Sequence, residues 1–124
     1  MPKKNFYPWR IGTINIRTGK EDLKIEKVIH EIAKAKLSIC CLQEVRRLNS
    51  NSVIISKKIE DVEQKYELYW SGHSVKRQQG VGIAIKIENG IDIEDVVSIN
   101  PRIIVANLSL HGCSLRIICC YAPT

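Results

Sequence analysis

The sequence of 124 residues lacks any run of about eighteen apolar residues, so we predict no membrane-spanning helix. Its first residues, Met1 to Tyr7, include two lysines but no apolar signal-peptide core, so we expect no secretory signal. It contains no internal repeat and no low-complexity segment. The hydrophobic content of 44% and charged content of 26% are ordinary for a globular chain, and the length favours one domain.

A disulfide framework is also lacking. The chain has five cysteines, an odd number, and no predicted secretory signal, which favours a reducing, intracellular compartment. Two adjacent pairs, Cys40-Cys41 and Cys119-Cys120, lie in strand-like runs. Because neighbouring side chains of a strand point to opposite faces, neither pair easily ligates a single zinc ion. We therefore predict that these cysteines serve as small buried hydrophobes.

A glycine-rich phosphate loop is missing as well. Gly80-x-Gly82 has no third glycine and no helix start behind it, so we predict close backbone packing there. Basic residues outnumber acidic ones by 19 to 13, which gives a net charge of +6 and an isoelectric point of about 9.2. This balance favours a polyanionic partner, and we predict that Lys76 and Arg77 of the polar loop 71–79 contact nucleic acid.

The chain opens with a predicted strand, helix and strand. Residues 11–16 have strand alternation, and Thr18 with Glu21 matches a capping box. A half-buried helix is predicted from the spacing of Ile25, Val28, Ile29 and Ile32. The next strand, 37–42, has apolar or near-apolar residues at every position except Ser38 and shows no alternation, which is typical of a strand covered on both faces. A right-handed crossover would make the two strands parallel neighbours.

The remaining segments favour antiparallel hairpins. Residues 53–62 fit either a strand or a helical face, and periodicity does not separate the two. We predict later strands at 66–70, 80–86, 91–97, 102–110 and 114–121, with the first two paired and the third at an edge. His111-Gly112 is a two-residue turn of the hairpin type.

Glu44 is the strongest candidate functional residue. It follows the buried strand 37–42, and chemistry in open α/β sheets collects beyond the carboxyl ends of strands. A carboxylate on a rigid strand end suits a hard divalent cation. The alternative is that Glu44 only solvates the strand end.

Four motifs on predicted strands carry a family resemblance. They are Thr-Ile-Asn-Ile-Arg-Thr at 13–18, Leu-Gln-Glu at 42–44, Gly-Val-Gly-Ile at 80–83 and Tyr-Ala-Pro-Thr at 121–124. In this order, over about residues 10–124, they resemble the N-terminal part of the endonuclease/exonuclease/phosphatase family. The residues of these motifs are most similar to those of the endonuclease of non-long-terminal-repeat retrotransposons and of craniofacial development protein 2-like proteins. Residues 1–9 would be an N-terminal tail.

The resemblance implies a fold, a reaction and a site. The fold would be α/β, part of a four-layered α/β sandwich (deoxyribonuclease I-like) with a mixed, largely antiparallel sheet. The reaction would be Mg²⁺-dependent phosphodiester cleavage in DNA, with Mn²⁺ as the alternative ion. Glu44 resembles the metal ligand, and Asn15 and Tyr121 resemble catalytic residues beside the phosphate. Without the family, Asn15 would be an Asx-turn residue and Tyr121 an aromatic at the edge of the core.

The chain departs from the family after Tyr121. The family's Gly-Asp-x-Asn and Ser-Asp-His-like segments do not occur, and none of the three histidines follows a Ser-Asp. We therefore expect the second half of the sandwich to be missing, the domain to turn over little or nothing alone, and an uncovered sheet face to promote self-association. The alternatives are a non-catalytic, basic nucleic-acid-binding module and a phosphatase of the same superfamily.

Overall fold

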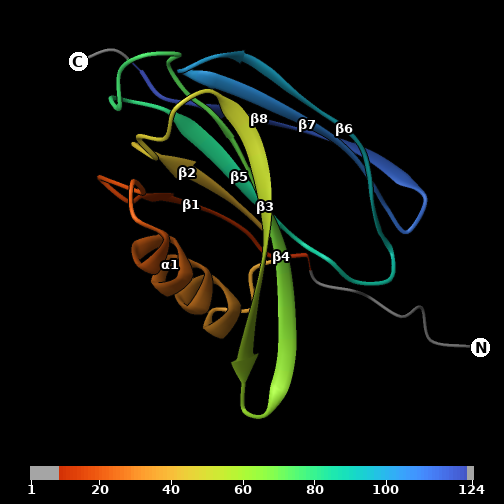
Figure 1. The fold of residues 1–124 in the computed structure, drawn as a ribbon. Helices are drawn as coiled ribbons and strands as arrows, with labels where there is room; N and C mark the ends of the chain where they lie inside the picture. Colours follow the sequence, from red (N-terminus) through yellow and green to blue (C-terminus); the bar gives the residue numbers. More distant parts are fainter. Residues whose placement is uncertain (1–8, 123–124) are drawn as a thin grey trace, which may run out of the picture.

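The computed structural model describes residues 9–122, so most of the predicted tail 1–9 and the last two residues of the Tyr-Ala-Pro-Thr motif lie outside it. Within this range it contains one helix and eight strands (Figure 1). They are β1 (Ile11–Asn15), α1 (Asp22–Lys34), β2 (Ile39–Gln43), β3 (Ser50–Ile59), β4 (Val62–Ser71), β5 (Val81–Lys86), β6 (Ile91–Asn100), β7 (Ile103–Leu110) and β8 (Cys113–Cys120).

Five strands form one sheet in the order β1-β2-β5-β4-β3. β1 and β2 are parallel and are joined by α1, whereas all the other pairs in this sheet are antiparallel. This confirms the predicted parallel pairing of the first two strands and the pairing of the predicted strands 66–70 and 80–86. Ile25, Ile29 and Ile32 of α1 are buried against one face of the sheet, as their helical spacing predicts.

A second sheet, β6-β7-β8, covers the other face of the five-stranded sheet (Figure 1). On β7, the alternate residues Ile104, Ala106, Leu108 and Leu110 are buried between the sheets, because successive strand residues point to opposite faces. On β2, Ile39 packs in this inter-sheet core, whereas Cys40 and Leu42 pack in the core under α1. The prediction that this strand is covered on both faces is therefore confirmed.

The predicted fold class, an α/β fold forming part of a four-layered α/β sandwich, is wrong. The described residues form a small β-rich domain with one helix and two sheets. The physical reason lies after β2. The ambiguous segment 53–62 forms the end of β3, the turn and the first residue of β4, and β3 pairs with β4 along its whole length. Every later connection is a hairpin or a loop between strands.

The predicted capping box is also wrong. The helix begins at Asp22 after Glu21, and no side chain caps its N-terminus. The Thr18 hydroxyl instead accepts a hydrogen bond from the Lys20 backbone N–H at 3.4 Å. The backbone N–H of Gly19 donates to the Val45 carbonyl at 2.8 Å, which ties this loop to the end of β2 rather than to the helix.

The outer face of the second sheet carries exposed apolar side chains. Val97 of β6 and Ile118 of β8 are 41% and 57% exposed. Both pair with Val105 of β7, one from each side. The second sheet covers β2, β5 and β4 of the five-stranded sheet, whereas Ile11 of the edge strand β1 stays 48% exposed. Within residues 9–122, no helix has the length and apolar character needed to cross a membrane.

Candidate functional site at the carboxyl end of strand β2

Glu44 leaves β2 in an unusual backbone conformation. Its φ is +58°, in the left-handed region that costs a non-glycine residue energy, and Arg46 follows with φ +56°. The turn is held by Val45, which is fully buried and whose N–H donates to the Gly80 carbonyl at 3.1 Å. The N–H of Arg46 donates to the Gln79 carbonyl at 2.8 Å. The end of β2 is therefore a fixed, strained turn, which is a common feature of functional sites.

A hydrogen bond joins Glu44 to Tyr121 across the two sheets. The Tyr121 hydroxyl donates to Oε1 of Glu44 at 2.7 Å, and Tyr121 directly follows β8. This bond lowers the pKa of the Glu44 carboxyl below its usual value and raises the pKa of the Tyr121 hydroxyl. At neutral pH the pair is therefore a carboxylate accepting from a protonated phenol.

Asn15 completes the contact from β1. It stands opposite Gln43 in the parallel register, so the carboxyl ends of β1 and β2 lie side by side. The Asn15 side chain interacts with the Glu44 carboxylate, and this interaction also lowers the pKa of Glu44. Its Oδ1 accepts from the Arg17 N–H at 3.0 Å, which is the Asx-turn geometry of the structural alternative. Asn15 thus serves the turn and the site together.

Three arginines surround this contact, and sequence reasoning assigned a site role to none of them. Nη2 of Arg46 lies 3.4 Å from Oε2 of Glu44, and the charge of Arg17 also favours the carboxylate. The Arg102 guanidinium lies 5.7 Å from the centre of the Tyr121 ring, and Nη1 donates to the Tyr121 carbonyl at 3.3 Å. One signal was available in the sequence. Arg17 and Arg46 each stand two residues after a predicted site residue.

Lys76 and Arg77 are exposed in the loop between β4 and β5. The loop ends at Gln79 and Gly80, whose carbonyls accept the backbone hydrogen bonds from Arg46 and Val45. It therefore emerges beside the turn that carries Glu44. The structure brings Asn15, Glu44 and Tyr121 together at the ends of neighbouring strands, and it places Lys76 and Arg77 in the adjacent loop rather than in that group.

The donor set suits a hard cation that keeps most of its water. The described residues contain no group of three or more His, Cys, Asp or Glu side chains that would hold a metal by themselves. Glu44 offers a half-buried, ionised carboxylate, and Asn15 and Tyr121 add oxygen-bearing polar groups. Mg²⁺ is commonly bound by one or two carboxylates together with substrate phosphates. The residues present therefore fit Mg²⁺ shared with a phosphate, and they do not fit an all-protein cage.

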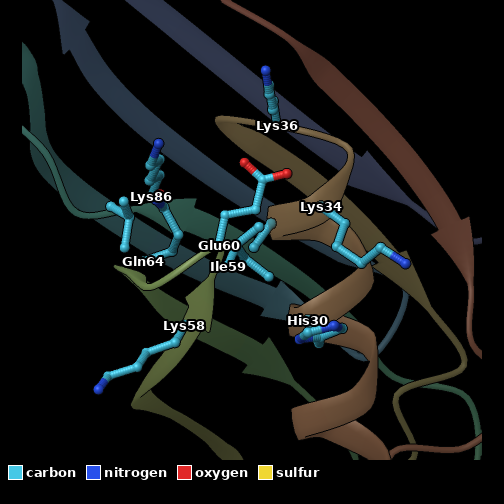
Figure 2. A pocket seen from close by; sticks show the side chains of 10 residues that line it. His30, Lys34, Lys36, Lys58, Ile59, Glu60, Gln64 and Lys86 are labelled. Atoms are coloured by element: carbon cyan, nitrogen blue, oxygen red, sulfur yellow. The ribbon is translucent and has the colours of Figure 1, made fainter.

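A separate hollow lies at the opposite end of the sheet. This pocket, with a volume of about 610 Å³, lies between the end of α1 and the β3–β4 hairpin, near Lys36 before β2 and Lys86 at the end of β5. Figure 2 shows Lys34, Lys36 and Lys58 at its rim, pointing away from one another. The basic groups of this pocket, unlike those around Glu44, do not converge on one point.

No family model matches the chain, and no curated protein matches it. The resemblance to the endonuclease/exonuclease/phosphatase family therefore rests on the four sequence motifs alone.

Proposed function

We propose that the Glu44 site binds Mg²⁺ together with a DNA phosphate, and that the protein is a Mg²⁺-dependent endonuclease domain of the retrotransposon type. The observation that supports this most directly is the 2.7 Å hydrogen bond between Tyr121 and Glu44, with Asn15 beside the same carboxylate at the end of β1. These are the three residues that the sequence motifs assign to the reaction. They come from three strands that are far apart in sequence.

Each residue has a role that its chemistry can perform. The carboxylate of Glu44, kept ionised by its lowered pKa, would hold the cation. When bound, Mg²⁺ would neutralise charge on the phosphate and on the departing oxygen. The Tyr121 hydroxyl and the Asn15 amide can donate hydrogen bonds to a non-bridging phosphate oxygen instead of to Glu44. Arg46 and Arg17 provide positive charge around the phosphate.

Activation of water requires a further group. Among the described residues, the side chains that interact with Glu44 are Tyr121, Asn15, Arg46 and Arg17, and none of these is a carboxylate or an imidazole. A general base must lie within hydrogen-bond reach of the attacking water. We therefore expect Mg²⁺-dependent DNA binding with little or no turnover by this chain alone.

The test compares DNA affinity in Mg²⁺ and in EDTA for the wild type and for Glu44→Gln. We expect Mg²⁺ to increase the affinity of the wild type, because the ion links Glu44 to a phosphate, and we expect Glu44→Gln to lose that increase. Glu63→Gln is the matched control, because Glu63 also has a lowered pKa but lies on β4, hydrogen-bonded to Ser56. If Glu44→Gln binds as well as the wild type or better in both buffers, the proposal fails.

That failure would favour the second candidate, a non-catalytic module that binds nucleic acid by charge. The observation behind it is the net charge of +6 together with the exposed Lys76 and Arg77. Nicking of supercoiled plasmid separates turnover from binding. Nicking that disappears both in Glu44→Ala and in EDTA would support the nuclease and refute the expectation of inactivity.

A further inference from the structure

Two cysteine thiols from different sheets meet beneath the Glu44 site. Cys41 of β2 and Cys119 of β8 both point into the core between the sheets. Their sequence neighbours do not. Cys40 is buried in the other core, under α1, and Cys120 is exposed on the outer face of β8. Each adjacent cysteine pair thus contributes one thiol to the same inter-sheet contact.

The contact joins the two sheets, and Cys41 is the more exposed of the two cysteines. The Cys41 and Cys119 thiols interact, and this interaction shifts the pKa of both. The Cys119 sulfur also lies 3.7 Å from the Leu42 carbonyl oxygen and 3.8 Å from Nε2 of Gln43, which places it against β2 at the two residues that follow Cys41. Cys119 is buried, whereas Cys41 is only partly buried, so Cys41 is the cysteine of the pair that a small oxidant would reach first.

We propose that Cys41 and Cys119 form a peroxide-sensitive dithiol that closes to a disulfide between the two sheets. The Cys41 thiolate would attack hydrogen peroxide, which forms an S–O bond, breaks the O–O bond and releases hydroxide. The Cys119 sulfur would then attack the sulfenic sulfur, forming the S–S bond and releasing a second hydroxide. The two thiol protons convert both hydroxides to water. Two thiols lose two electrons, and one peroxide gains them.

The electrostatics of the pair assign these two roles. The interaction with Cys119 lowers the pKa of the Cys41 thiol, whereas the same contact, together with burial, raises the pKa of Cys119. Cys41 is therefore the thiol that ionises first and attacks. Burial raises the pKa of the neighbouring Cys40 to about 12, which makes Cys40 unreactive.

The disulfide would act on the Glu44 site through the backbone. Cys41 stands three residues before Glu44, and Cys119 stands two residues before Tyr121. A covalent bond between β2 and β8 would therefore fix the two strands whose ends make the Glu44–Tyr121 hydrogen bond. In a reducing compartment such a bond would be transient, as for redox-sensing disulfides in general. Formation of the disulfide is independent of the function proposed for Glu44.

The experiment treats the reduced full chain with one equivalent of hydrogen peroxide, alkylates the remaining thiols and maps the products by mass spectrometry. We expect loss of two of the five thiols in a monomer and a link between the tryptic peptides 37–46 and 117–124. Because each peptide contains two adjacent cysteines, fragmentation must place the link at Cys41 and Cys119. This mapping on the wild type decides the assignment even if a variant fails to fold.

Matched variants sharpen the result. Cys40→Ala and Cys120→Ser should keep the link, whereas Cys41→Ser and Cys119→Ala should abolish it. The double variant Cys113→Ser with Cys120→Ser removes the two exposed cysteines, and it should therefore keep the intramolecular link and lose any link between molecules. A link that survives Cys41→Ser, or peroxide that oxidises only Cys113 and Cys120, would overturn the proposal.

Discussion

At the scale of single residues, the Tyr121–Glu44 hydrogen bond makes a prediction about titration. Tyr121→Phe removes the donor that contributes most to lowering the pKa of Glu44, so this pKa should rise towards its usual value of 4.5. Observing the Glu44 carboxyl carbon by NMR during a pH titration measures the shift directly. The Glu63 carboxyl, lowered mainly by its bond from Ser56, should not change. An unchanged pKa of Glu44 in Tyr121→Phe would show that the arginines, and not the phenol, lower this pKa.

The same shift predicts how stability depends on pH. A carboxyl whose folded pKa is lowered adds stability above its unfolded pKa and loses it as pH falls through the folded pKa. Wild type and Glu44→Gln should therefore differ most in free energy of unfolding above about pH 4.5, and the difference should shrink below that pH. Urea unfolding from pH 3 to pH 7 measures it. A difference that grows as the solution becomes more acidic would contradict the assigned direction.

At the scale of secondary-structure elements, two hairpin turns provide a matched pair. The β3–β4 turn places Glu60 and Asp61 at φ +51° and +65°, whereas the β7–β8 turn places His111 and Gly112 at +48° and +83°. Such turns favour glycine at the second position. Asp61→Gly should therefore raise the free energy of unfolding by about 1 kcal/mol. Gly112→Ala should lower it by about 1 kcal/mol through the backbone alone, because an added Cβ would meet no atom within 4 Å.

Chemical denaturation of these two variants measures both effects. Changes of opposite sign are the expected result, since one variant relieves a left-handed non-glycine residue and the other creates one. If Asp61→Gly has no effect, the turn is not strained at that position. The backbone argument used for Glu44 and Arg46 would then lose its support as well.

The helix face gives a larger expected effect. Ile29 is fully buried between α1 and the five-stranded sheet, so Ile29→Ala should lower the free energy of unfolding by about 2–5 kcal/mol. Leu23 lies on the same helix but is 60% exposed, and Leu23→Ala should change the stability by less than about 0.5 kcal/mol. Thermal unfolding of both variants checks this contrast. Similar losses would mean that α1 does not pack through its Ile29 face.

At this scale the sequence predicts an element correctly where its apolar residues follow the pattern of only one type of secondary structure. The isoleucines of α1 repeat at helical spacing only, and residues 39–42 are apolar throughout, so both elements were predicted correctly. The segment 53–62 contains Ile55, Ile59 and Val62, which suit either structure. In the structure it is the end of β3, the turn at residues 60–61 and the start of β4, paired as a hairpin. The strand order β1-β2-β5-β4-β3 and the packing of the second sheet depend on contacts between residues distant in sequence, which local patterns do not show, and this explains the wrong fold class.

At the scale of the whole molecule, the site was only partly predictable for a related reason. Strand ends are visible in sequence, so Asn15, Glu44 and Tyr121 could be named in advance and lie together in the structure. The position of Arg46 depends on the left-handed turn at Glu44, and that of Arg102 on the backbone bond between Arg102 and Tyr121. Both follow from tertiary contacts. The motifs therefore identify the centre of the site, and packing determines the charges around it.

The distribution of positive charge makes the last prediction, which concerns where DNA would contact the protein if it binds DNA as proposed. Lys76 and Arg77 stand in the loop beside Glu44, whereas Lys34 and Lys36 line the pocket at the opposite end of the sheet (Figure 2). Replacing either pair with glutamine lowers the net charge equally, from +6 to +4, because each pair loses two cations. Any difference between the double variants therefore reports position rather than total charge.

Each phosphate contact contributes about 0.9 to the slope of log K against log salt concentration for duplex DNA. If DNA lies across the Glu44 site, the variant at Lys76 and Arg77 should lose roughly 2 units of this slope, and the variant at Lys34 and Lys36 should lose little. Fluorescence anisotropy with a labelled duplex at several salt concentrations measures both slopes. Equal losses of slope would mean that DNA affinity depends only on the overall charge. A loss confined to the variant at Lys34 and Lys36 would mean that DNA binds at the opposite end of the sheet.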